Sequence, residues 1–128
     1  MTGANVEVVR DGIEAMNRGD WPTTERGLHP DIEWVIAREH PASRTIRGLE
    51  ELRAYMADWM ETLEGLRLEV DEIFERGDRV IAIGRVRGVG AGSGADVVVP
   101  IAFVNHFSEG VIVKVEEFLD PQEALDAP

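Results

Sequence analysis

A carboxylate on an otherwise apolar face of a strand is the residue of this sequence best suited to chemistry. The two-residue period of a strand places Glu117 on one side with three aliphatic residues, Val113, Val115 and Leu119. Burial among apolar side chains raises the pKa of a carboxyl group, which suits a general acid or base near neutral pH. We therefore predict that Glu117 is catalytic on the wall of a pocket. The alternative is a structural pair between Glu117 and an arginine.

Arg85 is the arginine that the sequence offers as the partner of Glu117. It lies in a strand in which residues 80–84 and Val86 are almost all apolar. A guanidinium in such a place is expected to orient Glu117 or to hold a substrate oxyanion. We predict Arg85 as a second catalytic residue. The alternative is an arginine that reaches the rim of the sheet or a dimer contact.

Large aromatic residues and one amide are the candidates for the pocket wall. Aromatic side chains give rigid apolar area, with a polar atom on Trp and Tyr, which suits cyclic ligands. A buried amide must hydrogen bond either to a ligand or to the backbone. The predicted ligand-binding residues are Trp34, Tyr55, Trp59, Phe103 and Asn105. For the aromatic residues the alternative is plain core packing.

The composition argues against several classes of site. The 128 residues include no cysteine, so the chain has no disulfide, thiolate nucleophile or Cys-ligated metal. The three histidines lack metal-binding spacing, and we expect neither a metal nor a cofactor. A formal net charge of −12 repels both nucleic-acid phosphates and anionic membranes. The glycine-rich stretch 88–94 joins two predicted strands and lacks the register of a phosphate-binding loop.

The elements that position these residues begin with helices. Apolar residues at steps of three and four predict helices over residues 6–18 and 48–64, and Pro22 after the cap Asp20 predicts a short helix over residues 21–27. Asn5 and Asp20 are expected to cap the first two helices, and Gly65 is expected to end the third. Between the second and third helices we predict a strand over residues 31–37 and a loop over residues 38–47.

The second half of the chain predicts four strands in succession and a short helix at the end. The strands cover residues 66–75, 79–89, 96–107 and 111–119, and the helix follows Asp120 and Pro121. Adjacent strands without helices between them favour an antiparallel sheet, so residues 1–128 are expected to form one α+β domain. Its outer face carries Ile81, Ile83, Ala102 and Val104, for which a second copy is the simplest cover.

Several short strings, taken in order, connect this layout to a known family. They are Asp31-Ile32-Glu33-Trp34, Arg47-Gly48, Gly77-Asp78-Arg79-Val80, the run from Phe107 to Val113, and Glu117-Phe118-Leu119-Asp120. Together they resemble the nuclear transport factor 2-like superfamily, particularly its SnoaL-like branch, although Val111 replaces the usual lysine. The resemblance implies a cone-shaped, curved antiparallel sheet wrapped on one face by three helices, and frequently a homodimer.

The resemblance also bears on function. The superfamily includes ketosteroid isomerases, polyketide cyclases, limonene-epoxide-type hydrolases and members without demonstrated activity. Glu117 matches the place where cyclases and epoxide hydrolases of this fold have a catalytic aspartate. Epoxide hydrolysis is less expected here because no aspartate stands beside Arg85 or Arg87.

The expected ligand is therefore a small apolar, cyclic metabolite. The expected reaction is proton abstraction next to a carbonyl by Glu117, as in isomerisation or aldol cyclisation. The alternative is a ligand-binding or dimerisation module without catalysis. The first five residues lack the basic and apolar regions of a signal peptide, and no run of about 18 apolar residues predicts a membrane span, so we expect a cytoplasmic protein.

Overall fold

The computed structural model describes residues 3–127. Met1, Thr2 and Pro128 lie outside the described residues. The prediction about a signal peptide rests on the first five residues, so it falls partly outside the described residues. The elements are α1 (Ala4–Asn17), α2 (Trp21–Arg26), β1 (Leu28–Val35), β2 (Thr45–Arg47), α3 (Leu49–Thr62), β3 (Leu63–Arg76), β4 (Arg79–Gly90), β5 (Asp96–Ser108), β6 (Val111–Phe118) and α4 (Pro121–Asp126). The predicted α+β class is confirmed.

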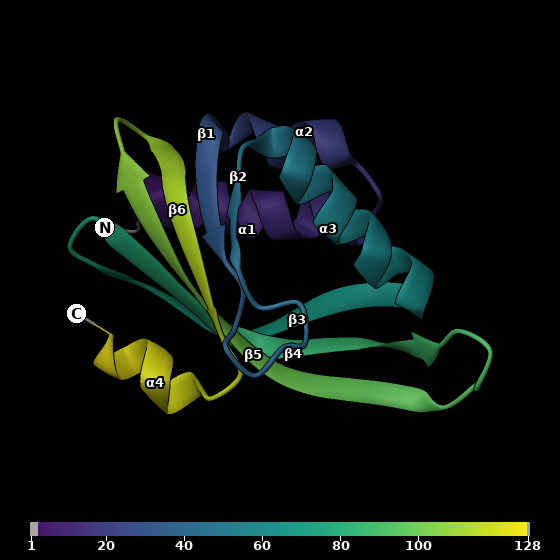
Figure 1. Ribbon diagram of the computed structural model, residues 1–128. Helices are drawn as coiled ribbons and strands as arrows, with labels where there is room; N and C mark the ends of the chain where they lie inside the picture. Colours follow the sequence, from purple (N-terminus) through teal and green to yellow (C-terminus); the bar gives the residue numbers. More distant parts are fainter. Residues whose placement is uncertain (1–2, 128) are drawn as a thin grey trace.

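The six strands form one curved sheet that does not close into a barrel (Figure 1). Their order is β2-β1-β6-β5-β4-β3. Neighbouring strands are antiparallel except β1 and β6, which run parallel. The prediction of a wholly antiparallel sheet is therefore wrong at this pair. Most of the chain separates β1 from β6, so no hairpin turn fixes their relative direction.

Helices α1, α2 and α3 cover the concave face of the sheet, whereas α4 lies on its other side (Figure 1). The core under the first three helices is built from aliphatic side chains of both layers: Val6, Val9, Leu28, Ile32, Ile46, Leu52, Val80, Ala82, Ile112 and Val115. Val6 and Val9 belong to the predicted apolar stripe of α1, so the helical period correctly identifies the buried face.

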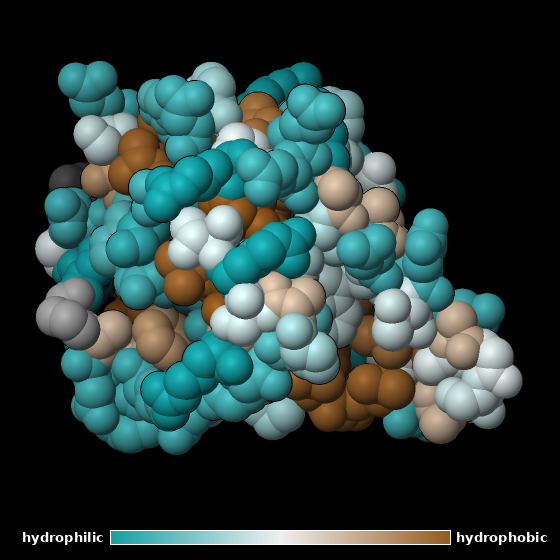
Figure 2. All heavy atoms as spheres, viewed as in Figure 1, coloured by the Kyte–Doolittle hydropathy of each residue, from teal (hydrophilic) through white to brown (hydrophobic). Residues whose placement is uncertain are grey.

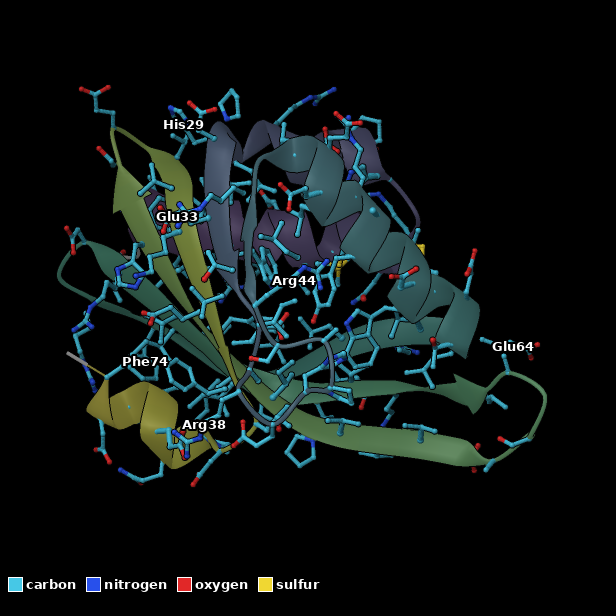
Figure 3. The ribbon with its side chains drawn as sticks, in the orientation of Figure 1. His29, Glu33, Arg38, Arg44, Glu64 and Phe74 are labelled. Carbon is cyan, nitrogen blue, oxygen red and sulfur yellow. The ribbon has the colours of Figure 1, made fainter. Side chains whose placement is uncertain are left out.

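Helix α4 covers apolar residues of the outer face. The buried cluster there consists of Ile81, Ala102, Val104 and Ala124. Phe74 packs against this cluster, and Figure 3 shows Phe74 and Arg38 next to α4. Arg38 also bonds to Glu123 of α4, at 2.5 Å. The argument that these outer-face residues need a second copy as cover is therefore wrong, because the chain covers them itself.

Several boundaries differ from the prediction. Helix α3 ends at Thr62 and β3 begins at once, so Gly65 does not end the helix. It lies in β3 with φ of 65°, where the pairing with β4 shifts register, a conformation that glycine adopts at little cost. Part of the predicted loop over residues 38–47 forms β2, which pairs with β1.

The predicted helix caps are partly confirmed. Asp20 accepts a hydrogen bond from the Thr23 amide at 3.2 Å, and Asp120 accepts one from the Gln122 amide at 2.9 Å. The prediction for Asn5 is wrong, since α1 begins at Ala4, two residues earlier than predicted, and Gly3 is its N-cap.

Polar side chains cover most of the surface over the helices, and a hydrophobic area lies over the β4–β5 arm (Figure 2). Val98 of β5 is 47% exposed. No helix within residues 3–127 is long and apolar enough to cross a membrane.

Candidate functional site

A cavity of about 110 Å³ lies between the first three helices and the concave face of the sheet. Its wall is mostly apolar and includes Val8, Val9, Ile13, Met16, Leu28, Met56, Leu66, Leu68, Val86, Ile101, Ile112 and Val115. All three tryptophans of the chain, Trp21, Trp34 and Trp59, line it. So do Glu117 and the five residues predicted to bind a ligand.

Strand register brings the polar end of the cavity together. Trp34 of β1 pairs with Val115 of β6, which pairs in turn with Asn105 of β5. In the adjacent row, Glu117 pairs with Phe103. Residues that pair, or that lie two positions apart on neighbouring strands, share a face and lie close together. These five side chains therefore form one surface, although they come from three strands.

A bulge in β6 changes which of its residues face the cavity. His106 pairs with Lys114 and Phe107 with Ile112, which leaves Val113 as an extra residue. Ile112, Val115 and Glu117 line the cavity, so the prediction that Val113 shares the side of Glu117 is wrong. The alternation from Val115 to Glu117 is unaffected because it lies beyond the bulge.

The carboxylate of Glu117 accepts hydrogen bonds from three groups. Trp34 Nε1 donates to Oε2 at 2.6 Å, and the Ala37 backbone amide lies 3.4 Å from Oε1. The Tyr55 hydroxyl of α3 lies 3.1 Å from Oε1 and 3.0 Å from Oε2. Glu117 is only 6% exposed, so these donors replace the water that a surface carboxylate would have.

Burial sets the charge state of this pair of residues. Desolvation raises the pKa of Glu117 above its ordinary value, and the hydrogen bonds from Trp34, Tyr55 and Ala37 oppose that rise only in part. Burial and the neighbouring Glu117 charge also raise the pKa of Tyr55. The tyrosine therefore remains a neutral phenol, while the carboxyl is poised to bind a proton more readily than a surface glutamate.

Arg85 does not contact Glu117. Its Nε lies 3.0 Å from Glu69 and its Nη1 lies 2.6 Å from Asp71. The next residue, Val86, lines the cavity, so the alternation of β4 directs Arg85 to the outer face. The predicted Arg85–Glu117 pair is therefore wrong: Arg85 instead pairs with Glu69 and Asp71 of β3.

Asn105 is a buried amide in the cavity wall, with an exposed fraction of 5%. Its Nδ2 donates to the carbonyl oxygen of Val80 at 3.1 Å. The sequence left open whether this amide bonds to the backbone or to a ligand. The bond to Val80 uses one hydrogen of Nδ2, and the oxygen Oδ1 stays available to a ligand.

Aromatic rings surround the carboxylate. The rings of Trp34 and Phe103 meet edge to face with centroids 6.0 Å apart, and those of Tyr55 and Trp59 do so at 6.5 Å. His40 lies against this second pair, with its ring centroid 5.5 Å from that of Trp59. Such contacts fix the ring positions around the polar end of the cavity.

The segment between β1 and β2 supplies parts of the site that the sequence did not indicate. Ala37 contributes a backbone amide, which carries no side-chain signal in a sequence. The charge of His40 acts on Glu117 to lower its pKa, and that of Arg44 acts likewise on Tyr55. Figure 3 shows Arg44 between β2 and α3. The proline beside His40 made this segment look like an ordinary surface loop.

One further polar atom is notable. Trp21 Nε1 is buried without a hydrogen-bond partner among the described side-chain atoms, and Trp21 lines the cavity from α2. Within residues 3–127, no group of three or more His, Asp or Glu side chains is arranged to hold a metal ion. The chemistry that the site offers is therefore that of a carboxyl group, a phenol, indoles and an amide.

Comparisons with known proteins agree with this architecture. A family model described as a SnoaL-like domain matches residues 9–115. This range contains all five candidate ligand-binding residues and ends two residues before Glu117.

The similar proteins share the fold over nearly the whole chain. An NTF2-like protein of unknown function from Burkholderia pseudomallei has a TM-score of 0.83 and 26% identity, with 98% of this chain and 97% of that chain covered. A protein from a Jannaschia species, provisionally named a SnoaL-like polyketide cyclase, has a TM-score of 0.79 and 22% identity, with 98% and 93% covered. An uncharacterized protein of Mycobacterium tuberculosis is 26% identical over 95 residues, which is 73% of this chain and 72% of that protein.

Proposed function

The chain belongs to the SnoaL-like domain family, and from this premise we propose that its cavity binds a small apolar, cyclic carbonyl compound on which Glu117 acts as a general acid and base. The observation that carries the proposal is a carboxylate 6% exposed in the wall of an apolar cavity. Desolvation that raises a carboxyl pKa brings it closer to the working pH, where proton transfer is most effective.

The proposed step is removal of a proton from the carbon next to the carbonyl. A Glu117 oxygen forms the new O–H bond and the C–H bond breaks. The C–H electron pair forms a C=C bond, and the π pair of the carbonyl moves to its oxygen to give an enolate. Return of the proton from Glu117 to another carbon completes an isomerisation, whereas attack of the enolate on a second carbonyl, whose oxygen then takes the proton from Glu117, gives an aldol cyclisation. The named similarity to a polyketide cyclase supports this class of reaction only by analogy of fold.

Tyr55 has a role in the same step. While Glu117 is ionised, the Tyr55 hydroxyl lies about equally far from both carboxylate oxygens, at 3.1 and 3.0 Å. Once Glu117 holds a proton, the carboxyl no longer needs this donor, and the hydroxyl becomes available to the enolate oxygen. Donors aimed at developing negative charge in a dry site stabilise the transition state strongly. Trp34, Trp59 and Phe103 would hold the ring of the substrate, and Arg85 has no part in the reaction.

The test is exchange of solvent deuterium into the α-carbon of single-ring ketones, followed by NMR. We expect Glu117→Gln, which keeps the shape of the side chain, to lower the exchange rate by about 10²-fold or more. Glu116→Gln is the matched control, because Glu116 is the adjacent carboxyl and pairs with His106 instead of facing Glu117's donors. Equal exchange in the wild type and Glu117→Gln would refute the catalytic role.

The second candidate function is ligand binding without catalysis. The three hydrogen bonds to Glu117 favour it, because a carboxylate with this many donors is also a stable structural element. A thermal-shift screen with steroid, terpene and polyketide fragments separates the two, since a ligand of the folded state raises the melting temperature. Stabilisation without any α-carbon exchange would favour the second candidate.

We also propose a homodimer in the cytoplasm. The exposed Val98 and the hydrophobic area over the β4–β5 arm support self-association, and the cysteine-free composition suits a reducing compartment. Light scattering at micromolar concentration gives the mass, and imaging of a fluorescent fusion gives the location. A mass of one chain, 14.2 kDa, would contradict the dimer.

A further inference from the structure

The amide of Asn105 has a defined orientation in the cavity wall. Nδ2 donates to the Val80 carbonyl oxygen, which can only accept, so the nitrogen and oxygen of the amide cannot be exchanged. The opposite atom, Oδ1, receives no hydrogen bond from any of residues 3–127, although Asn105 is 5% exposed. Among the described residues this oxygen does not belong to the fully buried side-chain atoms that lack a partner, so it is open to the cavity, where a ligand donor can bond to it.

The neighbouring protein donors are already committed. Trp34 Nε1, the Tyr55 hydroxyl and the Ala37 amide all converge on Glu117. Asn105 lies on the same face as Glu117, one row along the sheet. Apart from Trp21 Nε1, which reaches the cavity from α2 without a partner among the described residues, the polar atom left open to a ligand is an acceptor, Asn105 Oδ1.

The size and charge of the cavity restrict the ligand further. A volume of about 110 Å³ is of the order of a cavity that holds benzene, about 150 Å³. This volume therefore suits a single ring. An anionic ligand would meet the carboxylate of Glu117 in a site with little water, which is unfavourable.

We propose that the natural ligand is a neutral single-ring compound with a hydroxyl group that donates a hydrogen bond to Asn105 Oδ1. This inference rests on the proposed function, since it specifies the substrate of the same cavity. The substrate would then be a cyclic hydroxy-ketone or its enol, with the hydroxyl at Asn105 and the acidic carbon towards Glu117. Asn105 is a specificity-determining residue in this arrangement, and it takes no proton.

The test uses two probes of nearly equal size, cyclohexanol and cyclohexanone. The alcohol can donate a hydrogen bond and the ketone cannot. Because all three tryptophans line the cavity, the three indole N–H signals in a ¹H–¹⁵N spectrum report its occupancy directly. We expect cyclohexanol to bind about 2- to 10-fold more tightly than cyclohexanone, the range for one hydrogen bond. Equal affinity, or tighter binding of the ketone, would overturn the proposal.

Two variants separate this proposal from the catalytic one. Asn105→Leu should abolish the preference for the alcohol, and a preference that persists would overturn the assignment to Asn105. Glu117→Gln should keep the preference, so its loss in that variant would assign the hydroxyl to Glu117 instead. If Glu117→Gln shows wild-type α-carbon exchange while the preference depends on Asn105, the proposed catalysis fails and the ligand class stands.

A measurement on the wild type covers the case in which Asn105→Leu does not fold. The ¹³C signal of the Asn105 side-chain carbonyl should shift when cyclohexanol is added and stay in place with cyclohexanone. Identical behaviour with both probes would overturn the proposal.

Discussion

Glu117 is held by donors from three separate segments of the chain, and the shortest bond, 2.6 Å, comes from Trp34 Nε1. Trp34→Phe removes this donor and keeps an aromatic ring in the cavity. A hydrogen bond to the ionised form lowers a carboxyl pKa, so we expect the pKa of Glu117 to rise further in this variant. A ¹³C NMR titration of the Glu117 carboxyl measures it.

Trp21→Phe is the control for that experiment, because Trp21 lines the same cavity and is not among the described groups that act on the Glu117 pKa. It should leave the Glu117 pKa nearly where the wild type has it. A lower Glu117 pKa in Trp34→Phe, or equal changes in both variants, would argue against the indole as the donor.

The raised pKa of Glu117 also affects stability. Because its pKa in the folded protein lies above the ordinary 4.5, the native state binds this proton more tightly than the unfolded chain does. The contribution is therefore fully present below the ordinary pKa and is lost as pH rises through the folded-state pKa. Glu117→Gln cannot ionise, so the wild type should lose stability relative to it across this window.

Urea unfolding of both proteins at several pH values measures this difference. Comparison with the variant matters because Glu25 and Glu69 have lowered pKa values, owing mainly to hydrogen bonds from Arg53 and Arg87, and act in the opposite direction. A difference in the free energy of unfolding that does not change with pH, or that moves in favour of the wild type, would contradict a desolvated carboxyl.

The sequence could indicate Glu117 but not the true position of Arg85, and the reason is physical. Beyond the bulge of β6, Val115 and Glu117 lie two positions apart, so the alternation correctly indicates that both face the cavity. In β4 both faces are apolar, because the cavity takes one face and α4 covers part of the other. Alternation then carries no information about which side faces inward, and the arginine could be assigned to either.

At the scale of elements, we expect replacement of two glycines by alanine to change the stability of the protein in opposite directions. A methyl group at Gly84 of β4 would lie 1.8 Å from the backbone oxygen of Glu69, where β3 bulges. We expect Gly84→Ala to destabilise the protein by about 1–3 kcal/mol, because a backbone atom must move. A methyl group at Gly12 of α1 meets nothing within 4 Å, so Gly12→Ala should stabilise it by up to about 1 kcal/mol.

Thermal and urea unfolding of these two variants provide the check, with each serving as the other's control. A stable Gly84→Ala would mean that β3 and β4 can separate at the bulge. A destabilised Gly12→Ala would mean that α1 packs more closely on the cavity than its surroundings indicate.

Element boundaries were predictable where side chains cap or alternate, and not where the backbone decides. Asp20 and Asp120 cap their helices through their own side chains, which the sequence shows. Gly65 sits in a strand with a left-handed φ, and nothing local distinguishes this from a helix end. Strand β2 has only three residues, Thr45–Arg47, and depends on pairing with β1 rather than on its own pattern.

At the scale of the whole molecule, the order of helices and strands was enough to predict the class and the family. The match to a SnoaL-like domain over residues 9–115 confirms the resemblance drawn from the short strings. The parallel pairing of β1 with β6 could not be predicted from the sequence, because it joins segments about 80 residues apart. The hydrogen bond between Trp34 and Glu117 joins segments equally far apart. That same pairing brings Trp34 to the carboxylate, so the site depends on the least predictable contact of the sheet.

Helix α4 determines how the outer face meets solvent, and Ala124 is its central contact, with 1% exposure. Ala124→Asp places a charge against the apolar residues Ile81, Ala102 and Val104, and removal of that charge from water is costly. We expect α4 to detach, with a loss of about 3 kcal/mol or more in the free energy of unfolding and a rise in mean mass by light scattering as the uncovered strands associate. Gln122→Ala, at an exposed position of the same helix, is the control and should leave both quantities nearly unchanged, because it removes only one exposed hydrogen bond, to Asp126. Wild-type stability and mass in Ala124→Asp would mean that α4 is not needed to cover this face, and would restore a second copy as its cover.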